Sequence, residues 1–449
     1  MKKELKDSIH FEREDVGKLF RRLFHPTLIG MLSTVLFIIT DGVFVGKGLG
    51  SDALAAVNIV APIYMLATGI GLMTGMGASV VASIHIANRK IKVACLNITQ
   101  AIGLSTVLLL LLSVITLVFP TDTLKLFGCS DELMSSALEY AYFYLPFLFA
   151  HALLCGGQFF IRLDGSPRNA MFCSISAAVL NIILDYLYIF PLKWGLMGAA
   201  LASSTGAGVG AILVLLYLKN KRHTLHIVPI KSSLNSIRLT FRNIRYICQL
   251  GFSSLLCQMT VAFMMICGNL VFMRHAYEEG VAAFSIACYL FPIVFMLYNS
   301  ITQSSQPIIS YNYSIGNNSR VRAALIVALK TALGYSFGLT LCLIFLNESI
   351  VHLFISPNDT AYSIATQGIP LFAFGFLPFA INVLAIGYFQ SIERVRFAIL
   401  ITVLRGVVWM TVCFLCFPYY WGVTGAWLSV PFAELFTLMT IAVIWNRLR

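Results

Sequence analysis

Apolar stretches long enough to cross a bilayer as helices recur from one end of this 449-residue chain to the other. About 20 residues suffice, because a helix rises about 1.5 Å per residue and the hydrocarbon core is about 30 Å thick. Hydrophobic residues make up 59% of the chain and charged residues only 11%, whereas a soluble domain carries about 25% charged residues. In lipid every backbone polar group must be hydrogen-bonded internally, so such runs form helices. The sequence therefore predicts an all-α polytopic membrane protein.

We expect twelve transmembrane helices and no cleavable signal peptide, since the N-terminal stretch (1–22) is charged and contains no apolar run. The expected helices cover residues 24–46, 53–86, 93–119, 134–160, 169–190, 195–218, 243–271, 280–311, 321–346, 363–389, 397–417 and 422–446. Of the 31 lysines and arginines, 25 lie in the two tails and alternate loops and only four in the other loops. Positive residues stay in the cytoplasm, so both termini are predicted to be cytoplasmic.

The chain also repeats itself at a nearly constant spacing between its two halves. Residues 194–201 (WGLMGAAL) resemble residues 421–428 (WGVTGAWL), for example. Two parallel six-helix repeats place a substrate cavity between two lobes. We predict a cytoplasmic tail (1–22), an N-lobe (23–218), a basic cytoplasmic linker (219–242) and a C-lobe (243–446). The positive charge of the linker is explained by its role in fixing the topology and by attraction to anionic lipid head groups. No nucleic-acid partner is expected.

Two aspartates lie inside the apolar spans, where a carboxylate costs about 2.5–3.5 kcal/mol on insertion scales. Asp41 and Asp185 are both about five residues from the outer ends of outward-running helices, roughly 7–8 Å inside the boundary. Their repeat equivalents, Gly268 and Val412, carry no acid. The pair therefore suggests a cation site in one lobe, or a proton carrier. The alternative is that Asp41 is wet at the interface and that Asp185 only bonds to Asn181.

Polar neighbours extend this candidate site. Asn181 shares the face of Asp185 at i−4, and Thr34 and Phe37 share the face of Asp41. Ser203 lies on the next helix. Carboxylates, an amide and a hydroxyl suit a hard monovalent cation such as Na⁺.

Other residues within the spans are more ambiguous. Lys330 and Arg405 are close enough to the cytoplasmic ends to snorkel. Glu434 either pairs with Arg405 or contacts substrate. Pro26 is either a tolerated first-turn proline of helix one or a bend point that moves Asp41. Residues 303–307 (QSSQP) are predicted to break helix eight and to line the cavity.

Several motifs together resemble the multidrug and toxin extrusion (MATE) family over residues 20–446. They are the Thr40-Asp41 region and the segments 306–313 (QPIISYNY), 162–171 (RLDGSPRNAM), 181–185 (NIILD) and 194–200 (WGLMGAA). The resemblance implies two six-helix bundles around a central cavity, in a bacterial cytoplasmic (inner) membrane. It also implies efflux of organic cations and drugs by antiport against Na⁺ or H⁺, with no other cofactor and with a functional monomer.

The resemblance assigns roles by position. Asp41, Asn181 and Asp185 match the cation-linked site of the branch with N-lobe acids, Ser203 is the nearest match to its hydroxyl, and Pro26 is the hinge. The residues expected to face the substrate cavity are Phe37, Thr34, Gln158, Gln306, Tyr311 and Glu434. The chain departs from the family at Val261, where another branch has an acid, and at Gln158 and Ser310, where the family often has Asn and Gly.

Three other functions were weighed. A flippase for a lipid-linked or amphipathic metabolite shares the repeat plan, but it needs several cationic residues facing the cavity. A membrane-embedded enzyme needs a nucleophile, acid–base or metal-binding constellation, and the sequence offers none, so no enzymatic activity is expected. A channel differs from a carrier in that its flux does not saturate.

Overall fold

The computed structural model describes residues 11–127, 129–230, 233–354 and 357–448, and these ranges are almost entirely α-helical. Most of the predicted tail (residues 1–10) and part of the linker (231–232) lie outside the described residues. The first eight helices are α1 (Val16–Leu49), α2 (Ser51–Ala87), α3 (Ile91–Val118), α4 (Pro120–Leu126), α5 (Met134–Tyr144), α6 (Leu148–Leu163), α7 (Pro167–Ile189) and α8 (Gly195–Lys219). The others are α9 (Leu234–Ser314), α10 (Asn318–Phe345), α11 (Asn347–His352), α12 (Thr360–Ala373), α13 (Phe376–Ser391), α14 (Val395–Val403) and α15 (Trp409–Leu448). A short 3₁₀ turn, η1 (Leu145–Phe147), joins α5 to α6, and a π-helical turn, η2 (Leu404–Val408), joins α14 to α15.

The predicted all-α membrane fold is confirmed, and the described helices are consistent with the twelve predicted spans. Nine helical stretches of the described chain are long and apolar enough to cross a bilayer, and the bent pair α12 and α13 makes a tenth. Two of the nine contain a break in the helical backbone, α9 at Ala276 and Tyr277 and the last stretch at Gly422. If the two sides of each break are counted as separate helices, the number of candidate spans rises from ten to twelve. The chain is thus a multi-pass membrane protein, and its fold is consistent with the predicted twelve helices.

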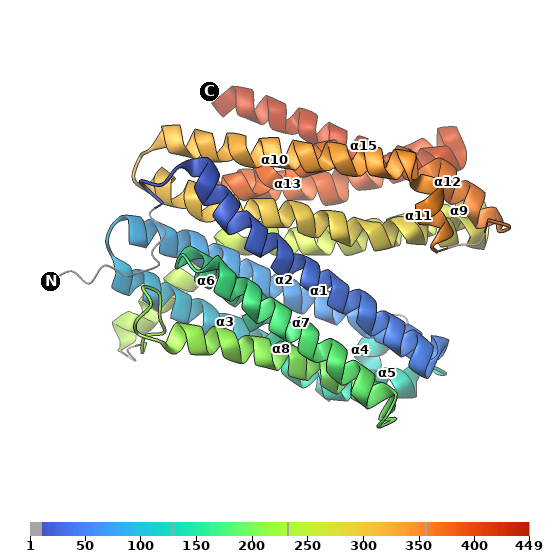
Figure 1. Ribbon diagram of the computed structural model, residues 1–449, viewed down its shortest axis with the longest axis horizontal. Helices are drawn as coiled ribbons and strands as arrows, with labels where there is room; N and C mark the ends of the chain where they lie inside the picture. Colours follow the sequence, from blue (N-terminus) through green and yellow to red (C-terminus); the bar gives the residue numbers. More distant parts are fainter. Residues whose placement is uncertain (1–10, 128, 231–232, 355–356, 449) are drawn as a thin grey trace. The chain divides into compact units, whose positions relative to one another are not determined.

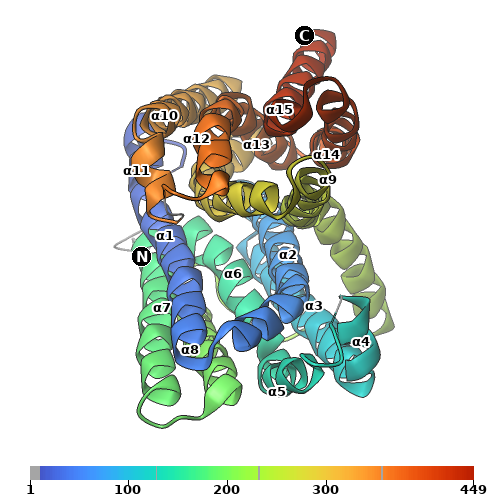
Figure 2. The same cartoon turned by 90° about the vertical axis from the view of Figure 1, so that its right-hand side faces the viewer.

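Contacts divide the chain into two compact units. Unit 1 comprises residues 1–258 and 310–318, and unit 2 comprises residues 259–309 and 319–449. Within unit 1, α1 packs on α7, α7 on α8, and α2 on α3 and α6, and these helices run side by side in Figures 1 and 2. The boundaries fall inside α9, so the first part of this helix packs with the first unit. The predicted lobe limits at 218 and 243 stay a prediction.

The first helix begins earlier than predicted, and this changes the position of Pro26. The helix α1 starts at Val16, with Asp15 as its N-cap accepting a hydrogen bond from the backbone N–H of Lys18 at 2.9 Å. Its first turns bury an amphipathic stripe: Val16, Leu19, Phe20, Leu23 and Phe24. A search for continuous apolar runs misses such a stripe, because Lys18, Arg21 and Arg22 interrupt it. Pro26 therefore lies inside the helix, and the first-turn interpretation is wrong.

The predicted break at residues 303–307 is also wrong. Pro307 lies inside α9, whose only non-helical residues in the described chain are Ala276 and Tyr277. The hydroxyls nearby bond back to their own helix: Ser304 Oγ donates to the carbonyl of Ser300 at 2.6 Å, and Ser305 Oγ to that of Thr302 at 2.9 Å. Local back-bonding of this kind satisfies polar groups without ending the helix.

The internal repeat is visible in the backbone conformation and not only in the sequence. Residues with positive φ recur in the second half at positions equivalent to those of the first. The four pairs are Gly50 and Tyr277, Arg89 and Gly316, Gly165 and Glu393, and Gly195 and Gly422. Each marks a corner between helices, where the left-handed region lets the chain reverse. Two halves that turn at the same positions support an internal duplication.

The start of the 219–242 linker is fixed to unit 1 by Asp164, the residue that follows α6. Its Oδ2 accepts a hydrogen bond from Tyr217 Oη at 2.7 Å, and its Oδ1 accepts one from the N–H of Leu225 at 2.8 Å. His223 lies 3.7 Å from Oδ2 and stacks on the ring of Tyr217. Burial raises the pKa of Asp164, against the opposing effect of the Tyr217 and Leu225 hydrogen bonds.

Candidate cation site

Four predicted site residues converge inside unit 1. Asp41 comes from α1, Asn181 and Asp185 from α7, and Ser203 from α8, and these three helices pack on one another. Asp41 is 8% exposed and Asp185 is fully buried. Asp41 is therefore largely enclosed by protein, and its position relative to the membrane interface stays a prediction.

A short chain of hydrogen bonds links three of these side chains. Asn181 Nδ2 donates to Ser203 Oγ at 3.2 Å, and Ser203 Oγ donates to Asp41 Oδ1 at 3.5 Å. The amide of Asn181 thus donates to Ser203, and the hydroxyl of Ser203 donates to Asp41. This arrangement leaves the carbonyl oxygen of Asn181 facing away from the chain of donors.

Asp185 lies beside Asp41, close enough for the two carboxyl groups to act on each other electrostatically. Neither oxygen of Asp185, nor Oδ1 of Asn181, has a hydrogen-bond partner among the described residues. Buried carboxylates without a donor or a counter-ion are strongly unfavourable. The charge of Asp185 is neutralised only if its carboxyl group takes up a proton or binds a cation. The unpaired oxygens of Asp185 and Asn181 are ligands of the kind that a hard monovalent ion prefers.

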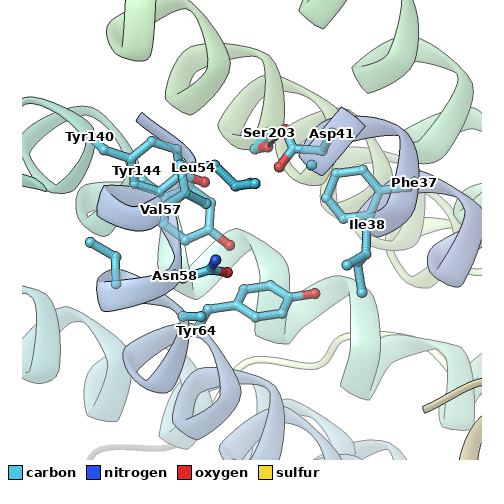
Figure 3. A pocket seen from close by; sticks show the side chains of 13 residues that line it. Phe37, Ile38, Asp41, Leu54, Val57, Asn58, Tyr64, Tyr140, Tyr144 and Ser203 are labelled. Carbon is cyan, nitrogen blue, oxygen red and sulfur yellow. Dashed lines mark hydrogen bonds between the residues drawn. The ribbon is translucent and has the colours of Figure 1, made fainter. Parts of the chain in front are cut away.

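A cavity of about 140 Å³ opens beside Asp41, lined by α1, α2, α5 and α8. In Figure 3, Asp41 and Ser203 point toward each other on one side of it, while Tyr140, Tyr144 and Asn58 lie across from them. A second cavity of about 30 Å³ lies next to the first, since Phe37, Tyr144 and Ser203 line both. Thr34 and Asn181 line the smaller cavity. Asp41 therefore faces a space that is both aromatic and polar, whereas Asp185 lines neither cavity.

Sequence reasoning missed four of the residues that line these spaces: Asn58, Tyr64, Tyr140 and Tyr144. Tyr140 and Tyr144 were detectable, because two tyrosines at i and i+4 share one face of a helix. Asn58 and Tyr64 gave no such signal, as the rotation of α2 is set by its neighbours. His151 also lines the smaller cavity, and its Nε2 lies 3.1 Å from Thr68 Oγ1.

Two other predicted residues of unit 1 lie away from the larger cavity. Gln158 Nε2 donates to Ser174 Oγ at 2.6 Å, and Ser174 lines the smaller cavity. Tyr311 packs against Phe11 in a tilted arrangement with ring centroids 5.6 Å apart, near the end of α9. The predicted contacts of Gln158 and Tyr311 with substrate stay predictions.

Gln306 and Glu434 belong to unit 2. Gln306 is 1% exposed. Glu434 is fully buried, and its Oε1 lies 2.6 Å from Nε of Arg405. The predicted ion pair between these residues is present, within one unit. Arg405 therefore does not snorkel.

Comparison with known proteins shows which family the sequence matches. The MatE family profile matches the chain twice, over residues 26–187 and 254–415. The second match begins and ends at positions equivalent to those of the first, in agreement with the repeat in the sequence and in the backbone turns.

Individual relatives are distant but extend over the whole chain. The multidrug export protein MepA of Staphylococcus aureus (strain MSSA476) is 24% identical over 451 residues, covering 98% of this chain and 96% of that protein. An outward-facing multidrug resistance MATE family transporter of the MOP superfamily shares the fold with a TM-score of 0.88 at 21% identity, covering 99% of this chain and 98% of that one. A MOP superfamily transporter from Pyrococcus furiosus also has a TM-score of 0.88, at 22% identity with the same coverage.

Proposed function

Because the chain belongs to the MatE family, we propose that it is a secondary antiporter that exports lipophilic organic cations in exchange for Na⁺ or H⁺. The coupling cation is assigned to Asp41 and Asp185, with Asn181 and Ser203 as its polar neighbours. The observation that carries this proposal is the buried carboxyl of Asp185, whose oxygens have no hydrogen-bond partner in the described chain. The distant relatives described as multidrug exporters support the substrate class.

The cavity beside Asp41 suits part of such a substrate. Tyrosine faces attract organic cations, each contact contributing about 0.5–2 kcal/mol, and Tyr64, Tyr140 and Tyr144 line this space. Its volume of about 140 Å³ is smaller than the roughly 300–1,000 Å³ of ligand pockets for drug-sized molecules. We assign it to the charged group of the substrate, while Thr34, Gln158, Gln306 and Tyr311 remain proposed substrate contacts.

The proposed coupling follows from competition for the same negative charge. A cation or proton bound at Asp41 and Asp185 neutralises the acids that hold the organic cation, so it favours release of the substrate. By linkage, the substrate must weaken cation binding by the same factor. Pro26 leaves one backbone carbonyl of α1 without its N–H partner, and we propose that bending there moves Asp41 during the cycle.

The alternative function as a flippase has less support. It needs cationic residues free to hold an anionic head group. Arg405 is instead paired with Glu434, and Lys330 is exposed on α10.

The test uses purified protein in liposomes with imposed gradients of Na⁺ or H⁺ applied separately, and ethidium as the transported probe. We expect Asp41→Asn to lose gradient-driven export by at least about tenfold, a loss equivalent to about 1.4 kcal/mol. Asp122→Asn is the matched control, because Asp122 is an exposed acid on α4, and it should export like the unmodified protein. Undiminished, gradient-dependent export by Asp41→Asn would overturn the proposed site.

A further inference from the structure

Unit 2 contains a buried carboxylate of its own, and its surroundings differ from those of Asp185. Glu434 lies on α15 and is fully buried, while Arg405 lies in the π-helical turn η2 and is 2% exposed. Arg405 Nε donates to Glu434 Oε1 at 2.6 Å. π-Helical turns are rare and occur mostly at functional positions.

Other groups around this pair bind the second carboxylate oxygen of Glu434 and pack on Arg405, whose Nη1 has no hydrogen-bond partner among the described residues. Asn382 Nδ2 on α13 donates to Glu434 Oε2 at 2.7 Å, and the guanidinium carbon of Arg405 lies 4.4 Å from the ring centroid of Phe379. Tyr298 on α9 is the other titratable side chain of the described chain that faces Glu434, and its hydroxyl accepts a hydrogen bond from Ser336. Both carboxylate oxygens of Glu434 thus have a donor, whereas those of Asp185 have none.

The repeat relates this cluster to the smaller cavity of unit 1. The positions of the first half equivalent to Glu434, Arg405, Asn382 and Phe379 are, in the same order, Ala207, Ala177 or Ala178, Leu154 or Cys155, and His151 or Ala152. His151, Leu154, Ala177, Ala178 and Ala207 all line the cavity of about 30 Å³ that also touches Asn181. Small side chains leave this space open in unit 1, and the ion pair fills its equivalent in unit 2.

We infer that Arg405 is a tethered counter-cation, which neutralises Glu434 in unit 2 as an exchangeable cation neutralises the acids in unit 1. A guanidinium stays protonated at all physiological pH values and cannot leave. Glu434 is thereby held ionised, so unit 2 neither loads nor releases a coupling ion. Arg405 is a positioning residue that restricts ion exchange to Asp41 and Asp185. This inference rests on the proposed function, because it concerns which carboxylates take part in coupling.

The decisive variant is Arg405→Met, which keeps an unbranched side chain over Phe379 and removes the charge. A buried carboxylate without a counter-ion must be neutralised, so Glu434 should then bind one exchangeable proton or Na⁺. We expect a potentiometric titration of the purified protein in sodium-free buffer to show one additional titrating carboxyl proton per molecule, and the cation-to-ethidium ratio in liposomes to rise by one. Both changes should be absent in Arg405→Lys and in the double variant Arg405→Met/Glu434→Gln. A folded Arg405→Met protein that binds as many protons as the unmodified protein would contradict the inference.

Labelling of the unmodified protein keeps the test decisive even if Arg405→Met does not fold. Hydrophobic carbodiimides react with protonated carboxyl groups in membranes, and mass spectrometry identifies the modified residues. We expect modification at Asp41 or Asp185, reduced by competing Na⁺ or high pH, and none at Glu434. Modification of Glu434 to a similar extent would overturn the inference. Proton counting and labelling do not depend on transport, so they separate failure of this inference from failure of the proposed antiport.

Discussion

Asp185 is a buried acid to which the described part of the protein offers neither a hydrogen-bond donor nor a counter-ion. It is fully buried beside a second carboxyl group, and its oxygens have no partner among the described residues. A ligand that binds only the folded protein stabilises it by about 2.7 kcal/mol at a hundredfold excess over its Kd. We therefore expect Na⁺, compared with choline at equal ionic strength, or a lower pH to raise the unfolding temperature by a few degrees. Asp185→Asn should lose this shift, and Asp122→Asn should keep it.

The thermal shift measured for Asp185→Asn can either support or contradict the assigned cation site. If the variant retains the full thermal shift, the stabilising cation binds elsewhere, and the assignment of these two aspartates fails. The basal unfolding temperature should not fall, because an amide avoids the cost of burying an ionised group without donors.

At the scale of the residue, the acids were predictable and the aromatic lining was only partly so. Asp41 and Asp185 stand out because charge is costly in hydrocarbon, and Asn181 follows from the helical period. Asn58 and Tyr64 lie on a helix that is apolar on all sides. The face that such a helix turns to a cavity depends on its neighbours, which one sequence does not specify.

At the scale of the element, Asp164 is one of several side chains that attach the 219–242 linker, together with Thr99 and Gln100. Asp164→Ala removes the acceptors of the Tyr217 hydroxyl and the Leu225 N–H, which costs about 1–3 kcal/mol when buried donors are left unpaired. We expect trypsin to cut after Arg222, which is exposed, about tenfold faster in this variant. Asp164→Asn retains an acceptor oxygen and should be cut at an intermediate rate. Equal cleavage rates in all three proteins would show that the linker is held by other contacts.

The same attachment should depend on pH with a definite sign. Burial raises the pKa of Asp164 above its ordinary value of 3.8, so the folded protein binds this proton more tightly than the unfolded chain does. Its contribution to stability is therefore largest below the ordinary pKa and declines as pH rises through the raised one. The difference in unfolding temperature between the unmodified protein and Asp164→Asn should follow this trend. A difference that grew with pH would mean that the hydrogen bonds outweigh burial.

The helices themselves were predicted well where their apolar runs are continuous. The prediction failed for the amphipathic start of α1, where charges interrupt the run, and at Pro307, where a proline lies within an unbroken helix. Both errors come from treating a local signal as decisive. Burial of one helical stripe stabilises the start of α1, and packing of the neighbouring turns stabilises the helix around Pro307.

At the scale of the whole molecule, the duplication predicted the plan of both halves but not their chemical differences. Equivalent corners turn at equivalent residues, and the acids of unit 1 have no counterpart in unit 2. Pairing of Arg405 with Glu434 was one of two predicted alternatives. The sequence could not decide between them, because the contact depends on the rotation of two helices and a π-helical turn.

The repeat also yields a stabilising substitution. One half turns at Gly50 with φ 95°, whereas the other turns at Tyr277 with φ 51°. A left-handed conformation costs a non-glycine residue about 1–2 kcal/mol, and the gain on substitution is partly offset by the greater freedom of glycine when unfolded. Tyr277 is 73% exposed, so few contacts are lost. We expect Tyr277→Gly to raise the free energy of unfolding by about 0.5–1 kcal/mol, measured by denaturation in detergent. Gly50→Ala, the matched change in the other half, should lower it by about 1–2 kcal/mol, and a destabilised Tyr277→Gly would mean that the tyrosine ring contributes more than its backbone costs.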